Sequence, residues 1–191
     1  MEFRGLRYFI GFAVVVGLLI FLLYLIFGGG SGQPAVPTTS RTLASYAQDD
    51  TSSVSFSIYG PVTAAETHKQ WVITVNANEA QYQEFQGYDG HVVKTETFHQ
   101  SVNGYTAFLL SLDHANFTKG NEANKNLDFR GYCPLGNAFI VELHAGGKTL
   151  EHYWSNSCGK PATFEGDLPT ISKLFETQIP NYPDLVASSG L

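Results

Sequence analysis

Sulfur-containing residues are scarce in this chain, which has a single methionine, Met1, and two cysteines, Cys133 and Cys158. One methionine excludes a Met-lined groove of the kind that promiscuous binding proteins use. Two thiolates are too few for a structural zinc site, and their spacing is not that of a Cys-x-x-Cys redox pair. We therefore expect a structural disulfide, which closes a loop of about 25 residues and stabilises the fold by about 3 kcal/mol.

Charge is missing from residues 8–27, which also lack Pro, Asn and Gln. Twenty apolar residues make a helix of about 30 Å, the thickness of the hydrocarbon core of a bilayer. Arg4 and Arg7 precede this run, and positive flanks stay in the cytoplasm. The pattern predicts a cytoplasmic tail (1–7), a single transmembrane helix (8–27) and an extracytoplasmic remainder in the cell membrane.

A cleaved signal peptide is the alternative for the same segment. Its apolar region is typically about 7–15 residues long and ends in an Ala-x-Ala-like site. The run here is longer, and Gly28–Gly32 follows it without such a site. These features favour a retained anchor.

Basic residues are few beyond the anchor: residues 53–191 hold 8 Lys and Arg against 14 Asp and Glu. Nucleic-acid binders usually carry a basic patch, so no nucleic-acid partner is expected. Residues 28–52 are rich in Gly, Ser, Thr and Pro and poor in large apolar side chains. Such a segment predicts a flexible tether, followed by an extracytoplasmic domain over 53–191.

The domain begins with residues that alternate between apolar and polar, as in half-buried strands. Four strands are expected, near 54–58, 69–76, 80–85 and 91–99. The apolar period then becomes helical over 102–115 and again over 167–178, where Asp167 is placed to cap. This order predicts an α+β domain with one antiparallel sheet and two helices packed on one face.

A hairpin is expected over 137–155, with Gly146-Gly147 at its turn. Counting back from the glycines pairs Phe139 with Trp154 and Val141 with His152 on the face toward the helices. The same register pairs Glu142 with Glu151 on the opposite face, beside His144. Like charges in direct opposition are unfavourable, unless solvent screens them or a bulge shifts the register.

Glu142, Glu151 and His144 are therefore the candidates for chemistry, because two carboxylates beside a histidine can share a proton or hold a divalent cation. The sequence contains no G-x-S-x-G elbow, no S-x-x-K and no phosphate-binding glycine loop. No cofactor or metal is expected from these patterns. A catalytic function is accordingly the less favoured hypothesis.

Exposed tyrosines are the better guide to partners, because Tyr is common on recognition surfaces. Tyr82, Tyr88 and Tyr132 lie near predicted strand ends or turns and form the candidate binding surface. The partner expected from this surface is an extracytoplasmic protein or a glycan.

The end of the chain has a distinctive series of short motifs, Cys158-Gly159, Phe164-Glu165-Gly166, Leu174-Phe175, Gln178-Ile179-Pro180 and Tyr182. This stretch resembles the ending of uncharacterised single-span exported proteins of Saccharibacteria-type bacteria. The resemblance covers roughly the last third of the chain. It implies a Gram-positive-like cell surface and supplies no activity.

The sequence thus favours a membrane-anchored, non-catalytic binding or envelope-accessory domain. One alternative is an extracytoplasmic hydrolase or metal-dependent enzyme that uses Glu142, Glu151 and His144. Another is an inhibitor of a secreted hydrolase, a role that suits a small disulfide-linked domain.

Overall fold

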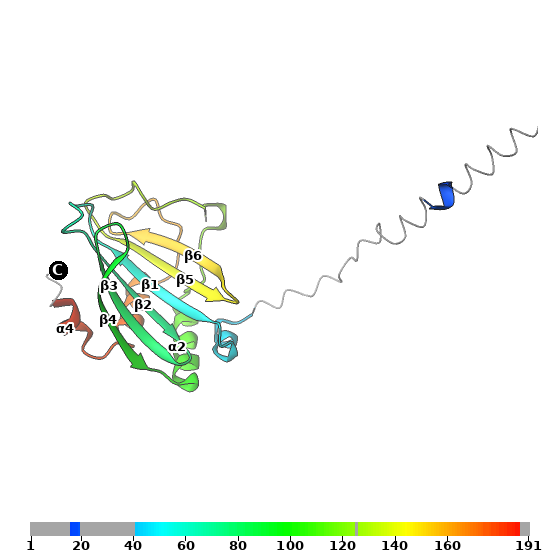
Figure 1. Ribbon diagram of the computed structural model, residues 1–191, viewed down its shortest axis with the longest axis horizontal. Coiled ribbons are helices and arrows are strands. Elements are labelled where there is room, and N and C mark those ends of the chain that lie inside the picture. The colour runs from blue at the N-terminus through cyan, green and yellow to red at the C-terminus, as the bar shows by residue number, and fades with distance from the viewer. Residues whose placement is uncertain (1–15, 20–40, 125, 188–191) are drawn as a thin grey trace, which may run out of the picture. The chain divides into compact units, whose positions relative to one another are not determined.

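The computed structural model describes residues 16–19, 41–124 and 126–187 (Figure 1). Residues 16–19 are helical and belong to a unit that ends at Ser40, and Arg41–Leu191 forms a second compact unit. Among the described residues, no helix has the length and apolar character needed to cross a membrane. Apart from residues 16–19, the predicted transmembrane helix lies outside them, as do the predicted cytoplasmic tail and tether residues 28–40.

The second unit is built on one six-stranded sheet in which all neighbouring strands are antiparallel. Its strands are β1 (Ser53–Tyr59), β2 (Lys69–Asn76), β3 (Glu79–Gln86), β4 (His91–His99), β5 (Ala138–Ala145) and β6 (Lys148–Asn156). The order across the sheet is β4-β3-β2-β1-β5-β6, so β4 and β6 are the edges. The expected α+β class with one antiparallel sheet is confirmed.

The two main helices are α2 (Val102–His114), which Ser101 caps, and α3 (Leu168–Glu176), which has the expected cap at Asp167. The Ser101 hydroxyl accepts a hydrogen bond from the Gly104 amide, and the Asp167 carboxylate accepts one from Thr170. Both helices contribute to the same hydrophobic core, on one face of the sheet (Figure 1). Three short elements accompany them, η1 (Leu43–Gln48), η2 (Glu122–Asn124) and α4 (Tyr182–Ala187).

The core is centred on Phe175 of α3, which is fully buried. Its ring lies 5.6 Å from that of Phe56 on β1 and 5.1 Å from that of Phe108 on α2. Aromatic pairs at these distances add to the burial of apolar surface. One side chain therefore joins the sheet to both main helices.

The compact unit begins at Arg41, earlier than the boundary at residue 53 expected from composition. Leu43 and Ala47 of η1 are each only 2% exposed and belong to the hydrophobic core. The Ser52 hydroxyl also donates a hydrogen bond to the Tyr46 carbonyl. A single leucine and an alanine are too weak a hydrophobic pattern to be recognised within a polar segment.

The β5–β6 hairpin turns at Gly146 and Gly147, whose φ angles of 58° and 72° suit a type I′ turn. A β-bulge then shifts the register between Leu143 and His144. His144 still pairs with Thr149, but beyond the bulge Glu142 is opposite His152 and Leu143 is opposite Glu151. The predicted pairing of Glu142 with Glu151 is therefore wrong, because one extra residue moves all later side chains to the other face.

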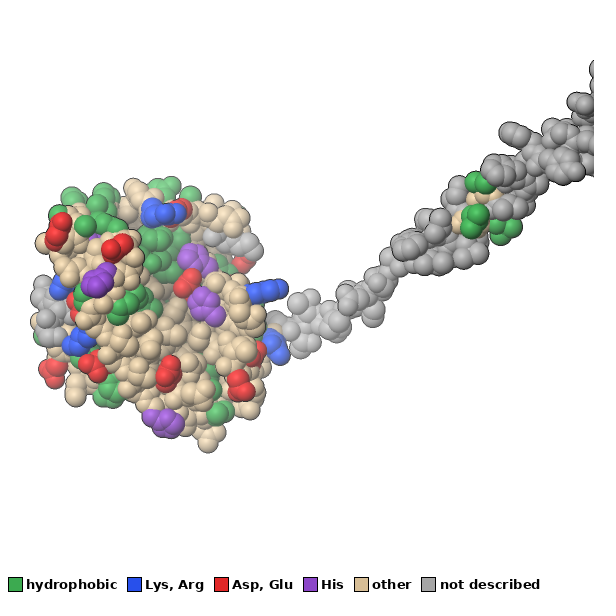
Figure 2. Space-filling view, viewed as in Figure 1, with side chains coloured by type: hydrophobic (Ala, Val, Ile, Leu, Met, Phe, Trp, Pro, Cys, Tyr) green, Lys and Arg blue, Asp and Glu red, His purple; other side chains and the backbone are tan. Residues whose placement is uncertain are grey.

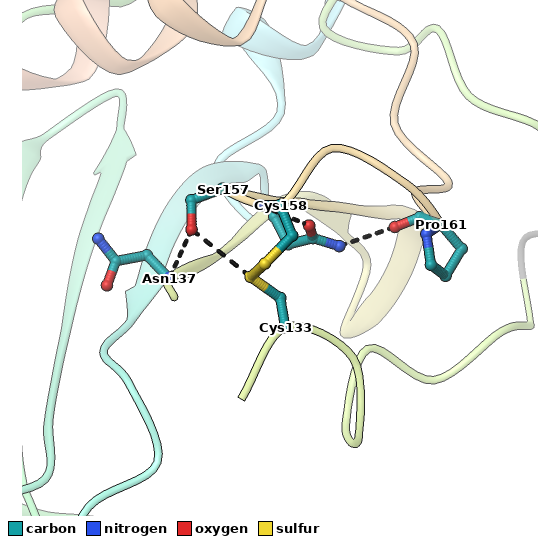
Figure 3. The surroundings of a disulfide bond; sticks show 6 residues. Cys133, Asn137, Ser157, Cys158 and Pro161 are labelled. Atoms are coloured by element: carbon teal, nitrogen blue, oxygen red, sulfur yellow. Dashed lines mark hydrogen bonds between the residues drawn. A yellow bond between two sulfur atoms is a disulfide. The ribbon is translucent and has the colours of Figure 1, made fainter. Parts of the chain in front are cut away.

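The predicted disulfide between Cys133 and Cys158 is present, with Cα atoms 5.7 Å apart (Figure 3). It joins the segment entering β5 to the segment leaving β6. Beside it, the Ser157 hydroxyl accepts a hydrogen bond from the Asn137 amide, as Figure 3 shows. The crosslink therefore fixes the end of the loop that precedes β5.

Candidate functional site

The face of the sheet opposite the helices is mainly polar and uncharged. Alternate residues of β1 point to this face, beginning with Ser53, Ser55 and Ser57 and ending with Tyr59. Figure 2 shows few charged side chains over this part of the molecule. We call it the open face, because no described helix packs against it.

A short loop covers one end of the open face, around Trp154 of β6. The Trp154 indole donates a hydrogen bond to the Leu127 carbonyl at 2.6 Å, and its ring stacks on Tyr132 at 5.7 Å. Trp154 was expected on the helix face beside Phe139. The bulge places it on the open face, where residues 127–132 bury it completely.

An aromatic cleft of about 390 Å³ lies beside this loop. Four aromatic rings line it, those of Tyr59, Tyr88, Phe129 and Tyr132, together with His68 and Gln70. We call this cavity the aromatic cleft. Among the described residues that line it, Arg130 alone has a full charge, and it is paired with Asp128 at 2.6 Å.

Tyr88 and Tyr132 each stack one ring face against another aromatic side chain. Tyr88 stacks on His68 at 4.1 Å, and its hydroxyl exchanges hydrogen bonds with the backbone of Thr63. Tyr132 stacks on Trp154 in the same way. Tyr88 remains 57% exposed and Tyr132 40% exposed. Both rings are therefore held in place from behind while part of their apolar surface stays accessible.

Two of the three tyrosines proposed as a binding surface thus come together in one cavity. Tyr82 does not, because it lies in register with Ile73 on the helix face and is only 1% exposed. The prediction that Tyr82 belongs to the binding surface is therefore wrong. The alternation of β3 directs Tyr82 into the core, where it contacts Tyr182 edge-on.

A second cavity, of about 780 Å³, lies on the other side of Phe129 and Arg130. It shares Tyr59, Phe129 and Arg130 with the aromatic cleft. It extends along β6 over Thr149, Leu150, Glu151 and His152. We call it the histidine groove.

Glu142 is the centre of a polar cluster next to this groove. One carboxylate oxygen lies 2.8 Å from Nδ1 of His152. The other accepts a hydrogen bond from Ser55 at 3.3 Å and lies 3.5 Å from Nε2 of His144. Figure 2 shows two histidine side chains and an acidic one gathered on this face.

The cluster changes the proton affinities of its members. The hydrogen bond from His152 holds the pKa of Glu142 below its usual range. The same hydrogen bond raises the pKa of His152, with a further contribution from the charge of Asp128. The pair thus favours a carboxylate beside an imidazolium. His152 was expected on the apolar face, so sequence analysis missed it as a partner of Glu142.

Glu151 lies on the opposite face of the sheet and takes no part in this cluster. Its carboxylate and that of Glu122 both contact the Tyr153 hydroxyl at 2.7 Å. Burial, followed by these two contacts, raises the pKa of Tyr153. The structure therefore brings Glu142 and His144 together but separates them from Glu151. Within the described part of the chain, no three His, Cys, Asp or Glu side chains are arranged to hold a metal ion.

Comparison with models of protein families finds none that matches this sequence, and comparison with curated proteins finds no match.

Proposed function

We propose that the chain is a membrane-anchored, extracytoplasmic binding domain whose aromatic cleft takes a neutral glycan. The observation that carries the proposal is the pair of supported tyrosines, Tyr88 and Tyr132, lining one cavity. A sugar ring has an apolar face of C–H groups that suits an aromatic ring, and an edge of hydroxyls that needs polar partners. Tyr88 and Tyr132 offer the first kind of surface, and Gln70 offers the second.

The size and charge of the cleft support this ligand class. Its volume of about 390 Å³ lies in the range of about 300–1,000 Å³ typical of small-molecule pockets. The Arg130 charge is balanced by Asp128, so a charged ligand would find no unpaired partner in this pair. Side chains already locked by stacking also lose little conformational entropy on binding.

A placement outside the membrane rests on three features. Residues 8–27 have the length and composition of a bilayer span, and Arg4 and Arg7 favour a cytoplasmic N-terminus. The disulfide between Cys133 and Cys158 suits an oxidising compartment. A C-terminal alkaline phosphatase fusion, which is active only outside the cytoplasm, tests the placement. We expect activity from this fusion and none from a C-terminal β-galactosidase fusion.

Binding is tested with residues 41–191 and purified neutral cell-wall polysaccharides, by titration calorimetry. Replacing Tyr88 by Leu removes the ring and should weaken binding at least tenfold, whereas Tyr88→Phe keeps the ring and should bind within about threefold. Leu110→Ala, on exposed surface of α2, is the matched control. Equal binding by Tyr88→Leu and the control would refute the cleft as the site.

A hydrolase is the second candidate, because the His152–Glu142 pair lies beside the histidine groove. An imidazolium held by a carboxylate can donate a proton as a general acid. Turnover of a peptide or glycan that Glu142→Gln abolishes, without loss of binding, would favour this function over a purely binding one.

A further inference from the structure

The outer side of the edge strand β4 pairs with no other strand among the described residues. Nine residues long, it is hydrogen-bonded to β3 on one side only. Thr95, Thr97 and His99 are all exposed. Edge strands of this length usually need protection, because unpaired backbone groups are a template for another strand.

The hydrogen-bonding pattern shows which backbone groups face outward. The Gln100 amide donates to the Asn78 carbonyl at 2.8 Å, so Gln100 faces β3. Pairing with β3 is regular from Lys94 to His99, and antiparallel strands alternate inward and outward residues. Thr95 and Thr97 therefore present both N–H and C=O groups to the outer edge. Within the described part of the chain, these groups have no backbone partner.

The charged side chains on either side of Thr95 would complement those of a second copy of β4. Lys94 and Glu96 flank it and point to the same face of the sheet, in register with Glu84 and Tyr82. If two copies of β4 pair antiparallel about Thr95, Lys94 of each copy lies opposite Glu96 of the other. Opposite charges in direct cross-strand positions are stabilising.

We propose that β4 is a homodimer interface, in which Thr95 of one copy pairs with Thr95 of a second copy. A two-fold axis perpendicular to the sheet relates the copies and joins the two sheets into one of twelve strands. A self-complementary patch of this kind is what a two-fold interface requires. The alternative centre at Thr97 places Glu96 opposite Phe98 and gains no charge pair.

The pairing has a consequence for binding. A two-fold axis perpendicular to a sheet leaves each face on its own side, so both aromatic clefts open to the same side. A surface-bound polymer could then occupy both clefts, which increases apparent affinity without new contacts. The dimer itself rests on β4 alone and does not depend on the proposed glycan function.

Cysteine crosslinking of the full-length chain in membranes tests the register. Opposed Thr95 residues would have Cα atoms about 5.5 Å apart, inside the range of about 4.4–6.8 Å that a disulfide spans. Thr97 residues would be about 14 Å apart along the strands. With a mild oxidant, Thr95→Cys should give a dimer band at least tenfold stronger than Thr97→Cys. No dimer from Thr95→Cys, or an equal band from Thr97→Cys, would overturn the proposal.

A charge exchange in the Thr95→Cys background provides an independent test. Lys94→Glu places like charges in opposition and should reduce crosslinking at least fivefold. Adding Glu96→Lys restores opposite charges and should recover most of the dimer band. A melting temperature for each variant separates lost pairing from lost folding. Failure of the double exchange to recover crosslinking in a folded chain would count against the Thr95-centred dimer.

Discussion

Nδ1 of His152 and Oε1 of Glu142 lie 2.8 Å apart on neighbouring strands, on the face of the sheet opposite the helices. This contact exists because a bulge shifts the hairpin by one residue. The pH dependence of stability therefore depends on the bulge, because a regular hairpin would place Glu142 opposite Glu151 instead of His152.

The first prediction concerns that pH dependence. The pKa of His152 is raised above 6.5, so its contribution to stability is complete below pH 6.5 and is lost as pH rises through the raised pKa. The pKa of Glu142 is lowered below 4.5, so its contribution is complete above pH 4.5 and is lost as pH falls through the lowered pKa. The pair therefore stabilises the fold most between pH 4.5 and 6.5.

Urea unfolding of Glu142→Gln across pH 4–9 checks this prediction. We expect the variant to lose about 1 kcal/mol or less within that window, since solvent screens a half-exposed pair. Its stability should also vary less with pH than that of the wild type. Glu165→Gln, at an exposed position, is the control and should keep the wild-type profile. A wild-type profile in Glu142→Gln would show that the contact does not stabilise the fold.

The second prediction concerns Gly120, which lies against the ring of Tyr153. A Cβ atom at this position would overlap the ring. The ring has little freedom to move, because its hydroxyl is hydrogen-bonded to Glu122 and Glu151. Gly120→Ala should therefore lower the free energy of unfolding by about 1–3 kcal/mol, the usual cost of overpacking. Denaturant melts would contradict this account if the variant were as stable as the wild type.

The third prediction concerns the core. Phe175→Ala leaves a cavity between Phe56, Phe108 and Phe117 and should cost about 3–5 kcal/mol. Leu135→Ala should change stability by less than about 0.5 kcal/mol, because Leu135 is 87% exposed. Chemical denaturation of both variants compares the two sites directly. Similar losses would mean that Phe175 is not the centre of the core.

The fourth prediction concerns the disulfide. Replacing Cys133 and Cys158 by Ser should lower stability by about 3 kcal/mol, because the unfolded chain gains the freedom of a 25-residue loop. The loop that carries Phe129 and Tyr132 ends at Cys133, so its protection from amide hydrogen exchange should fall as well. Exchange in α2 is the internal reference, and an equal loss of protection there would indicate general destabilisation instead.

Most elements of the fold could be predicted from the sequence, because they are long strands with alternating polarity and two amphipathic helices. The strands 69–76 and 91–99 have the expected bounds. The helix cap at Asp167 also follows from local chemistry. Local periodicity was strong in all these segments.

The candidate site was harder to predict, because it depends on the bulge at Leu143. Nothing in the local sequence distinguishes a regular hairpin from one with an extra residue at Leu150. The bulge nevertheless decides the faces of Glu151, His152 and Trp154. The aromatic cleft also joins Tyr88 to Tyr132, which are far apart in sequence and meet only through the loop fixed by Cys133.

The most direct test of the proposed function is a titration of residues 41–191 with a neutral cell-wall oligosaccharide, followed by amide chemical shifts. A glycan in the aromatic cleft should shift the signals of Gln70, Tyr88 and Tyr132 in a saturable way and leave those of α2 unchanged. Saturable shifts confined to other surfaces, or none at millimolar oligosaccharide, would contradict the account.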